Sequence, residues 1–170
     1  MKRNIVLVGF MGTGKTVVGK ALAESLGFRY IDTDLMVEAD AHMPISRIFE
    51  LQGEPAFRNL EAQAILRTTH LTRFIISTGG GAVISDQNIE NMKKAGLVVC
   101  LTAEPEIIYE RTKSDKSRPL LQTPDPRKKI QSLLNIRAPQ YQKADVMIDT
   151  SHLAIPEVVR KILDEWQKYQ

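Results

Sequence analysis

The sequence predicts an α/β fold, a three-layer sandwich in which a parallel sheet of about five strands has helices on both faces. Two observations predict this fold. Short, uninterrupted apolar runs, typical of strands buried on both faces, alternate with helix-like stretches along all 170 residues. Neither an internal repeat nor a low-complexity linker breaks the alternation. The pattern therefore favours one domain over residues 1–170, built around a doubly covered parallel sheet.

The expected strands are short apolar runs, and the expected helices carry apolar residues at helical spacing. The first strand, 5–8, is followed by a helix over 16–26, which ends at Gly27, a typical C-terminal cap. The later strands are expected at 28–31, 74–76, 98–101 and 146–148. The later helices are expected at 34–40, 46–51, 54–69, 86–95, 104–112, 128–142 and 156–168. The charged, proline-containing segment 113–126 is expected to be a mobile loop.

Composition excludes several classes of protein. Hydrophobic residues make up 43% and charged residues 25%, which argues against disorder. The net charge of +3 suits an anionic substrate as well as nucleic acid, so charge alone selects no partner. The single cysteine, Cys100, excludes an intramolecular disulfide and a cysteine metal cluster. The longest apolar runs fall well short of a membrane span of about 18 residues, and we expect a cytoplasmic protein.

A phosphate-binding loop is expected between the first strand and the first helix. Residues 9–16 read GFMGTGKT, which matches the pattern G-x-x-x-x-G-K-[ST]. Glycines let the backbone curl so that successive N–H groups face phosphate oxygens, and the helix N-terminus favours negative charge. Lys15 would reach the β- and γ-phosphates, and the Thr16 hydroxyl would bind Mg²⁺. The motif predicts a protein that uses a nucleoside triphosphate.

That motif alone leaves a small-molecule kinase and a GTPase-type switch open. Residues 112–115 read TKSD, which fits the guanine motif [NT]-K-x-D of GTPases. Here, however, the motif continues a helix into a charged loop instead of following a buried strand. The sequence also lacks the D-x-x-G motif that senses a γ-phosphate. Both observations favour the kinase.

Three motifs are candidates for the acceptor side. Asp32 and Asp34 directly follow the second strand, and two carboxylates two residues apart on an extended strand point the same way. One could serve the Mg²⁺ shell and the other an acceptor hydroxyl, although Asp34 could also merely cap a helix. Arg58 and Glu61 form either a plain surface ion pair or a braced guanidinium that clamps a carboxylate. The adjacent glycines 79–81 favour close approach of a ligand to the backbone.

Two arginines have no decisive pattern of their own. Arg118 lies in the segment expected to be mobile, where an arginine can swing onto a transferring phosphate. Arg137 lies in the helix expected over 128–142 and could be an ordinary surface residue. Spacing alone leaves both assignments open.

Taken together, these motifs resemble the shikimate kinase family of phosphate-loop proteins. The resemblance extends from residue 5 to about 156. It rests on GFMGTGKT, Asp32-Thr33-Asp34, Gly53-Glu54-x-x-Phe57-Arg58-x-x-Glu61, Thr78-Gly79-Gly80-Gly81, Arg118-Pro119-Leu120-Leu121 and Arg137-x-Pro139-x-Tyr141. It implies phosphorylation of the 3-hydroxyl of shikimate by ATP, a sheet of order 2-3-1-4-5, a substrate-binding segment over 34–69 and a lid over 113–126.

The resemblance also implies a role for individual residues. For shikimate they are Asp34, Arg58, Gly80, Gly81 and Arg137. For ATP they are Gly12, Thr13, Gly14, Lys15, Thr16, Val17, Arg111 and Arg118, and for Mg²⁺ they are Thr16 and Asp32. Lys15, Asp34 and Arg118 would be catalytic. Arg111 is placed near adenine by position only, and the residue of 151–156 that meets the base stays open.

Other acceptors and partners are weighed against this implication. A nucleotide kinase transfers to a phosphate, which the Asp34 carboxylate would repel. A gluconate-type sugar-acid kinase needs a similar clamp, but the triple glycine and the Arg118-Pro119-Leu120-Leu121 motif favour shikimate. A nucleic-acid-binding module would need an aromatic-basic motif, which the sequence lacks. We expect a monomer that binds ATP and shikimate, with no nucleic acid or membrane partner, and three scattered histidines that form no metal site.

Overall fold

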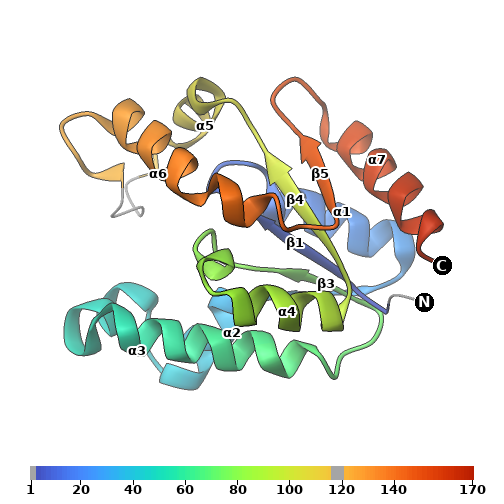
Figure 1. Cartoon of the computed structure of the whole chain (residues 1–170), viewed down its shortest axis with the longest axis horizontal. Coiled ribbons are helices and arrows are strands. Elements are labelled where there is room, and N and C mark those ends of the chain that lie inside the picture. The colour runs from blue at the N-terminus through green and yellow to red at the C-terminus, as the bar shows by residue number, and fades with distance from the viewer. Residues whose placement is uncertain (1–2, 116–120) are drawn as a thin grey trace.

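Five parallel strands form one sheet in the order β2-β3-β1-β4-β5, as expected (Figure 1). The structure is a computed structural model that describes residues 3–115 and 121–170. The strands are β1 (Ile5–Gly9), β2 (Arg29–Asp32), β3 (Phe74–Ser77), β4 (Leu97–Thr102) and β5 (Val146–Asp149). All five residues of the central strand β1 are buried, because β3 and β4 flank it and helices cover both of its faces. This double burial explains its uninterrupted apolar run.

Helices cover the sheet in two layers. Helices α1 (Lys15–Leu26) and α7 (Ile155–Lys168) pack on one face, where Trp166 meets Phe28 edge to face at 6.1 Å between ring centroids. The other face is covered by α3 (Ile45–Thr68), α4 (Asp86–Ala95), α5 (Pro105–Thr112) and α6 (Pro126–Tyr141). A short helix, α2 (Thr33–Ala41), packs on α3, and a 3₁₀ turn, η1 (Ala82–Ile84), precedes α4. In the view of Figure 1, α2, α3 and α4 lie side by side below β3.

The strand order brings three loops together. The carboxyl ends of β2, β3 and β1 are neighbours at one edge of the parallel sheet, and ligands of open α/β sheets bind at such edges. The chain that follows β1 is the glycine-rich loop 9–16, the chain after β2 carries Asp32 and Asp34, and the chain after β3 carries glycines 79–81. The fold therefore assembles motifs that lie up to 70 residues apart in the sequence.

One local expectation needs correction. Asp34 does not extend strand β2, because the helix α2 begins at Thr33 and the Asp32 side chain caps it by accepting a hydrogen bond from the Asp34 N–H at 2.9 Å. The two carboxylates are therefore not presented side by side from a strand. The two helices expected over 46–51 and 54–69 are confirmed: α3 spans both, and Gly53, with φ 80° and ψ 173°, leaves the helical conformation and kinks the chain between them.

Gly96 provides a test of the packing between α4 and β1. A Cβ atom at this position would lie 2.1 Å from the backbone oxygen of the buried Asn4, which cannot move away easily. We expect Gly96→Ala to lower the free energy of unfolding by about 2–4 kcal/mol, measured by urea denaturation. Gly27→Ala is the matched control: it has φ 61° but no neighbouring atom within 4 Å, so about 1 kcal/mol is expected. Equal losses in the two variants would contradict this description of the core.

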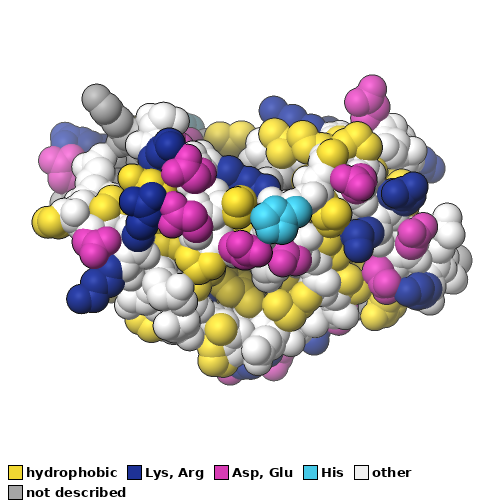
Figure 2. Space-filling model, turned by 90° about the horizontal axis from the view of Figure 1, so that it is seen from above, with side chains coloured by type: hydrophobic (Ala, Val, Ile, Leu, Met, Phe, Trp, Pro, Cys, Tyr) yellow, Lys and Arg dark blue, Asp and Glu magenta, His cyan; other side chains and the backbone are white. Residues whose placement is uncertain are grey.

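The described surface has mixed charge. On the face shown in Figure 2, basic and acidic side chains are interspersed and form no large patch of one sign. Among the described residues, no helix combines the length and the apolar character needed to cross a bilayer.

Candidate active site

The loop after β1 has the geometry of an anion cradle. Its three glycines, Gly9, Gly12 and Gly14, have positive φ angles of 138°, 76° and 97°, which other residues adopt only with strain. Gly14 is the N-cap of α1 and contributes no capping side chain, so the helix N-terminus remains available to an anion. The Lys15 ammonium lies across the loop and donates to the carbonyls of Gly9 at 2.7 Å and Phe10 at 3.0 Å.

Thr16 and Asp32 are brought together beside this loop. The Tyr30 hydroxyl donates to the Asp32 carboxylate at 3.4 Å, and the hydroxyls of Thr16 and Ser77 also hydrogen-bond with the Tyr30 hydroxyl. Burial raises the pKa of Tyr30, so the phenol stays protonated and keeps its donor. Tyr30 was not predicted as a site residue from the sequence, because tyrosine is common in strands and its position there gives no sign of a functional role. A hydroxyl and a carboxylate are oxygen donors of the kind that Mg²⁺ prefers.

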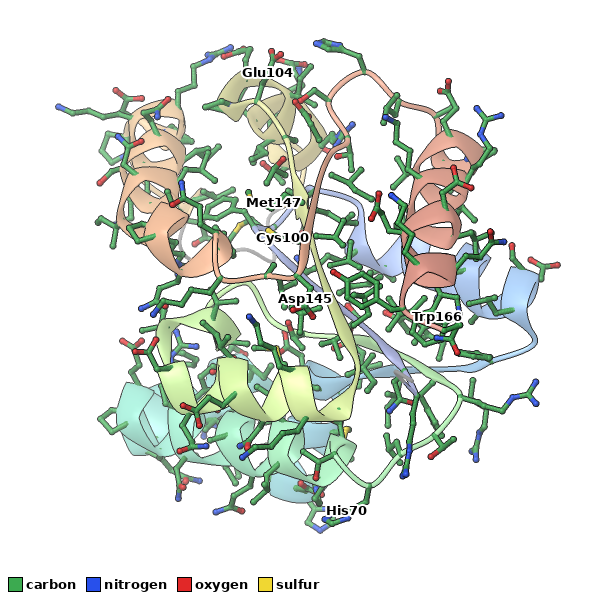
Figure 3. The ribbon with its side chains drawn as sticks, turned by 45° about the vertical axis from the view of Figure 1, so that its right-hand side comes forward. His70, Cys100, Glu104, Asp145, Met147 and Trp166 are labelled. Atoms are coloured by element: carbon green, nitrogen blue, oxygen red, sulfur yellow. The ribbon has the colours of Figure 1, made fainter. Side chains whose placement is uncertain are left out.

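A metal site made of side chains alone is absent from the part of the chain that the structure describes. No group of three or more histidine, cysteine, aspartate or glutamate side chains there is arranged to hold a metal ion. Figure 3 shows His70, Cys100 and Glu104 well apart from one another. Thr16 and Asp32 therefore suit an ion that takes its other ligands from phosphates and water.

Asp34 has the most perturbed carboxyl group of the site. Burial, with added repulsion from Asp32 and Glu61, raises its pKa to about 6, although the nearby Lys15 ammonium opposes the shift. Its Oδ1 atom is buried and has no hydrogen-bond partner among the described residues. A Cβ atom on Gly79 would lie 2.7 Å from this oxygen, so Asp34 lies directly against the glycine turn. This oxygen is therefore free to accept a hydrogen bond from a bound molecule, such as one from a hydroxyl group.

Arg58 is braced from two sides. Its guanidinium donates to the buried carboxylate of Glu61 at 2.9 Å and to Glu54 at 3.1 Å. Burial opposes the charge of Arg58, but these carboxylates outweigh it and raise the pKa of the guanidinium. A Cβ atom on Gly81 would lie 2.7 Å from both terminal nitrogens of Arg58. The pair is therefore a fixed feature of the site and not a plain surface ion pair.

Arg137 is buried between the phosphate-loop side and the glycine turn. Its side chain is 7% exposed, and its guanidinium carbon lies 5.6 Å from the Phe10 ring centroid. A Cβ atom on Gly80 would lie 3.6 Å from Arg137 Nη1. Each of the three glycines thus faces one candidate acceptor residue: Gly79 faces Asp34, Gly80 faces Arg137 and Gly81 faces Arg58.

A cavity of about 500 Å³ opens beside this clamp. Arg58 and Gly81 contribute to its wall, together with neighbouring residues of α3, η1 and the start of α4. The Arg58 guanidinium is consequently accessible from outside the core.

Arg111 connects the phosphate loop to the chain after β5. It donates to the Gly12 carbonyl at 3.2 Å and to the hydroxyl and carbonyl of Thr150 at 3.1 and 2.9 Å. Thr150 in turn donates to the Thr13 carbonyl at 3.0 Å. Thr150 carries no recognisable motif, so its role at this junction could not be inferred from the sequence. Arg118 and the centre of the expected lid, 116–120, lie outside the described residues.

Comparison with known proteins assigns this arrangement to a family. The family model described as shikimate kinase matches residues 11–167, which is nearly the whole chain. The chain belongs to the shikimate kinase family. The expected resemblance is thereby confirmed.

Individual shikimate kinases are similar to this chain over nearly their whole length. The shikimate kinase of Thermodesulfovibrio yellowstonii is 46% identical over 166 residues, which cover 98% of this chain and 96% of that protein. The shikimate kinase of Thermoanaerobacter pseudethanolicus is 47% identical and covers 95% and 94%. The solved structure of shikimate kinase from Acinetobacter baumannii in complex with shikimate has a TM-score of 0.93 and 39% identity, and covers 100% and 96%.

A sugar-acid kinase is more distant. A gluconokinase from Sinorhizobium meliloti has a TM-score of 0.63 and 18% identity, which shows a shared fold alone. The phosphate-loop kinase fold is therefore common to both.

Proposed function

We propose that this shikimate kinase transfers the γ-phosphoryl group of ATP to the 3-hydroxyl of shikimate. The products are shikimate 3-phosphate and ADP, on the route to chorismate and the aromatic amino acids. The observation that carries the proposal is the convergence of Asp34, Arg58 and Arg137 on one glycine turn next to the phosphate loop. Two guanidinium groups and one carboxylate complement a small molecule with one carboxylate and several hydroxyls.

The acceptor is oriented by opposite charges at its two ends. Arg58 and Arg137 pair with the shikimate carboxylate, and the Asp34 carboxylate accepts hydrogen bonds from the ring hydroxyls. The backbones of Gly80 and Gly81 form the floor of the site, because a side chain at Gly81 would displace Arg58. Asp34 also takes the proton of the attacking hydroxyl as the phosphoryl group arrives. Its raised pKa of about 6 suits that exchange near neutral pH.

The nucleotide is held by the loop and by cations around it. Its contacts are Gly12, Thr13, Gly14, Lys15, Thr16, Val17, Arg111 and Arg118. Lys15 would leave its loop carbonyls for the phosphates and stabilise the charge that develops during transfer. Arg118, from the lid over 113–126, would add a second cation. Mg²⁺, held by Thr16 and partly through water by Asp32, would neutralise phosphate charge.

The wider organisation of the protein is proposed from the same resemblance. The chain forms one catalytic domain in which 34–69 is the acceptor-binding segment. We propose that it acts as a monomer in the cytoplasm, with ATP and shikimate as its partners.

The test is ADP release from MgATP by the purified protein, with shikimate, gluconate, AMP and no acceptor offered in parallel. The proposal predicts release that depends on shikimate, with gluconate and AMP at the level of the blank. Turnover with gluconate or AMP and none with shikimate would contradict the acceptor assignment while leaving the phosphate loop intact.

A further inference from the structure

Tyr141 makes a hydrogen bond into the glycine turn from a distant part of the chain. It is the last residue of α6, one helical turn after Arg137, and its side chain is 4% exposed. Its hydroxyl donates to the Gly80 carbonyl oxygen at 2.8 Å. Burial raises the pKa of Tyr141 to about 12, with Arg137 acting in the opposite direction, so the hydroxyl keeps its proton.

The glycine turn is held by its carbonyl groups. Gly79 O accepts from the Ala82 N–H at 3.1 Å, and Gly81 O accepts from the Ile84 N–H at 3.1 Å. Gly80 O, between them, is held by a side chain 61 residues away in the sequence. Local backbone bonds therefore fix the first and third carbonyls, whereas the direction of the middle one depends on Tyr141.

Fixing a carbonyl also fixes the next N–H group. The peptide unit is planar and trans, so the Gly80 C=O and the Gly81 N–H point in opposite directions. With the carbonyl turned toward Tyr141, the Gly81 N–H is turned away from α6. The Cα of Gly81 is the one that faces the Arg58 guanidinium. Because neither glycine has a Cβ, this peptide can rotate at little steric cost once its carbonyl is released.

We propose that Tyr141 is a positioning residue for the acceptor, which holds the Gly80–Gly81 peptide so that the Gly81 N–H donates to the bound substrate. The inference rests on the proposed function, since it requires the acceptor to lie on the glycine turn. It also links the turn to Arg137, because Arg137 and Tyr141 are four residues apart on the same helix face and interact. Helix α6 thereby positions two contacts of the acceptor: the Arg137 guanidinium directly, and the Gly81 N–H through Tyr141.

Tyr141→Phe removes the hydroxyl and leaves the buried ring in place. We expect the KM for shikimate to rise about three- to tenfold, the effect of one misdirected hydrogen bond, while the KM for ATP stays within about twofold. Tyr169→Phe is the matched control, because Tyr169 is 37% exposed and lies at the end of α7. Unchanged shikimate KM in Tyr141→Phe, or an equal rise in both KM values, would overturn the proposal.

A second measurement on the unaltered protein keeps the proposal testable if Tyr141→Phe folds poorly. In ¹⁵N-labelled protein, the Gly81 amide resonance is expected to shift on titration with shikimate. A Gly81 amide that stays unchanged at saturation would overturn the role of Tyr141. A wild-type protein that fails to turn over shikimate would instead contradict the proposed function, so the two failures are distinguishable.

Discussion

Replacing Asp34 by asparagine is expected to lower kcat by about 100-fold or more and at the same time to stabilise the folded protein at neutral pH. Activity is lost because the asparagine amide cannot take the proton of the attacking hydroxyl. The amide also has only one oxygen that accepts hydrogen bonds, whereas the carboxylate has two. The gain in stability follows because the native chain keeps a carboxylate in a largely buried site, next to Asp32 and Glu61.

The sign of the stability effect comes from the raised pKa. Between about pH 3.8 and about pH 6 the folded protein retains the Asp34 proton and the unfolded chain releases it, so wild-type stability falls as the pH rises. Above about pH 6 the full penalty is present, on the order of 1–3 kcal/mol. Asp34→Asn escapes it, so its advantage over wild type should grow between pH 4 and pH 6 and then level off.

Urea denaturation at pH 4.5 and pH 8, together with steady-state kinetics, measures both effects. Asp40→Asn is the control on the same helix, because Asp40 is an exposed partner of Arg67. That variant should keep its kcat and show no gain that grows with pH. An Asp34→Asn enzyme with more than half of wild-type kcat and an unchanged shikimate KM would contradict the catalytic assignment.

Replacing Gly81 by alanine is expected to raise the KM for shikimate about tenfold or more while leaving the KM for ATP nearly unchanged. The φ of −94° at Gly81 is accessible to alanine, so the backbone itself is not strained. The new Cβ would lie 2.7 Å from both terminal nitrogens of Arg58, and the guanidinium is the group that must move. Some stability is also lost, because the buried Glu61 carboxylate loses its partner.

Arg58→Lys tests the same contact from the other side. A lysine keeps the positive charge but not the fork that pairs a carboxylate through two hydrogen bonds, so a similar rise in shikimate KM is expected. Gly27→Ala, far from the site, should leave both KM values unchanged. If Gly81→Ala and Arg58→Lys bind shikimate as wild type does, the clamp is assigned to the wrong residues.

Much of the fold follows from the sequence because its signals are local. The loop over 9–16 has its glycines where positive φ angles are needed, and the apolar run of β1 reflects burial on both faces. The strand order was implied by the family resemblance and is confirmed. The extended reading of Asp34 was wrong, because the Asp32 side chain caps a helix that starts one residue after the strand.

The site is less visible in the sequence because its geometry depends on tertiary contacts. An arginine and a glutamate three residues apart look the same in a surface pair and in the Arg58–Glu61 pair, and only burial of Glu61 separates the two. The hydrogen bond from Tyr141 to Gly80 joins residues 61 positions apart, so it cannot be predicted from the spacing of residues in the sequence. The roles of the individual site residues stay predictions, including that of Arg118.

The most direct test of the account is a crystal structure of the protein with shikimate and MgADP. The account predicts the shikimate carboxylate within hydrogen-bond distance of both Arg58 and Arg137, a ring hydroxyl on Asp34, and the ring lying on the glycine turn. A carboxylate bound away from both arginines, or a ring whose hydroxyls do not contact Asp34, would contradict it.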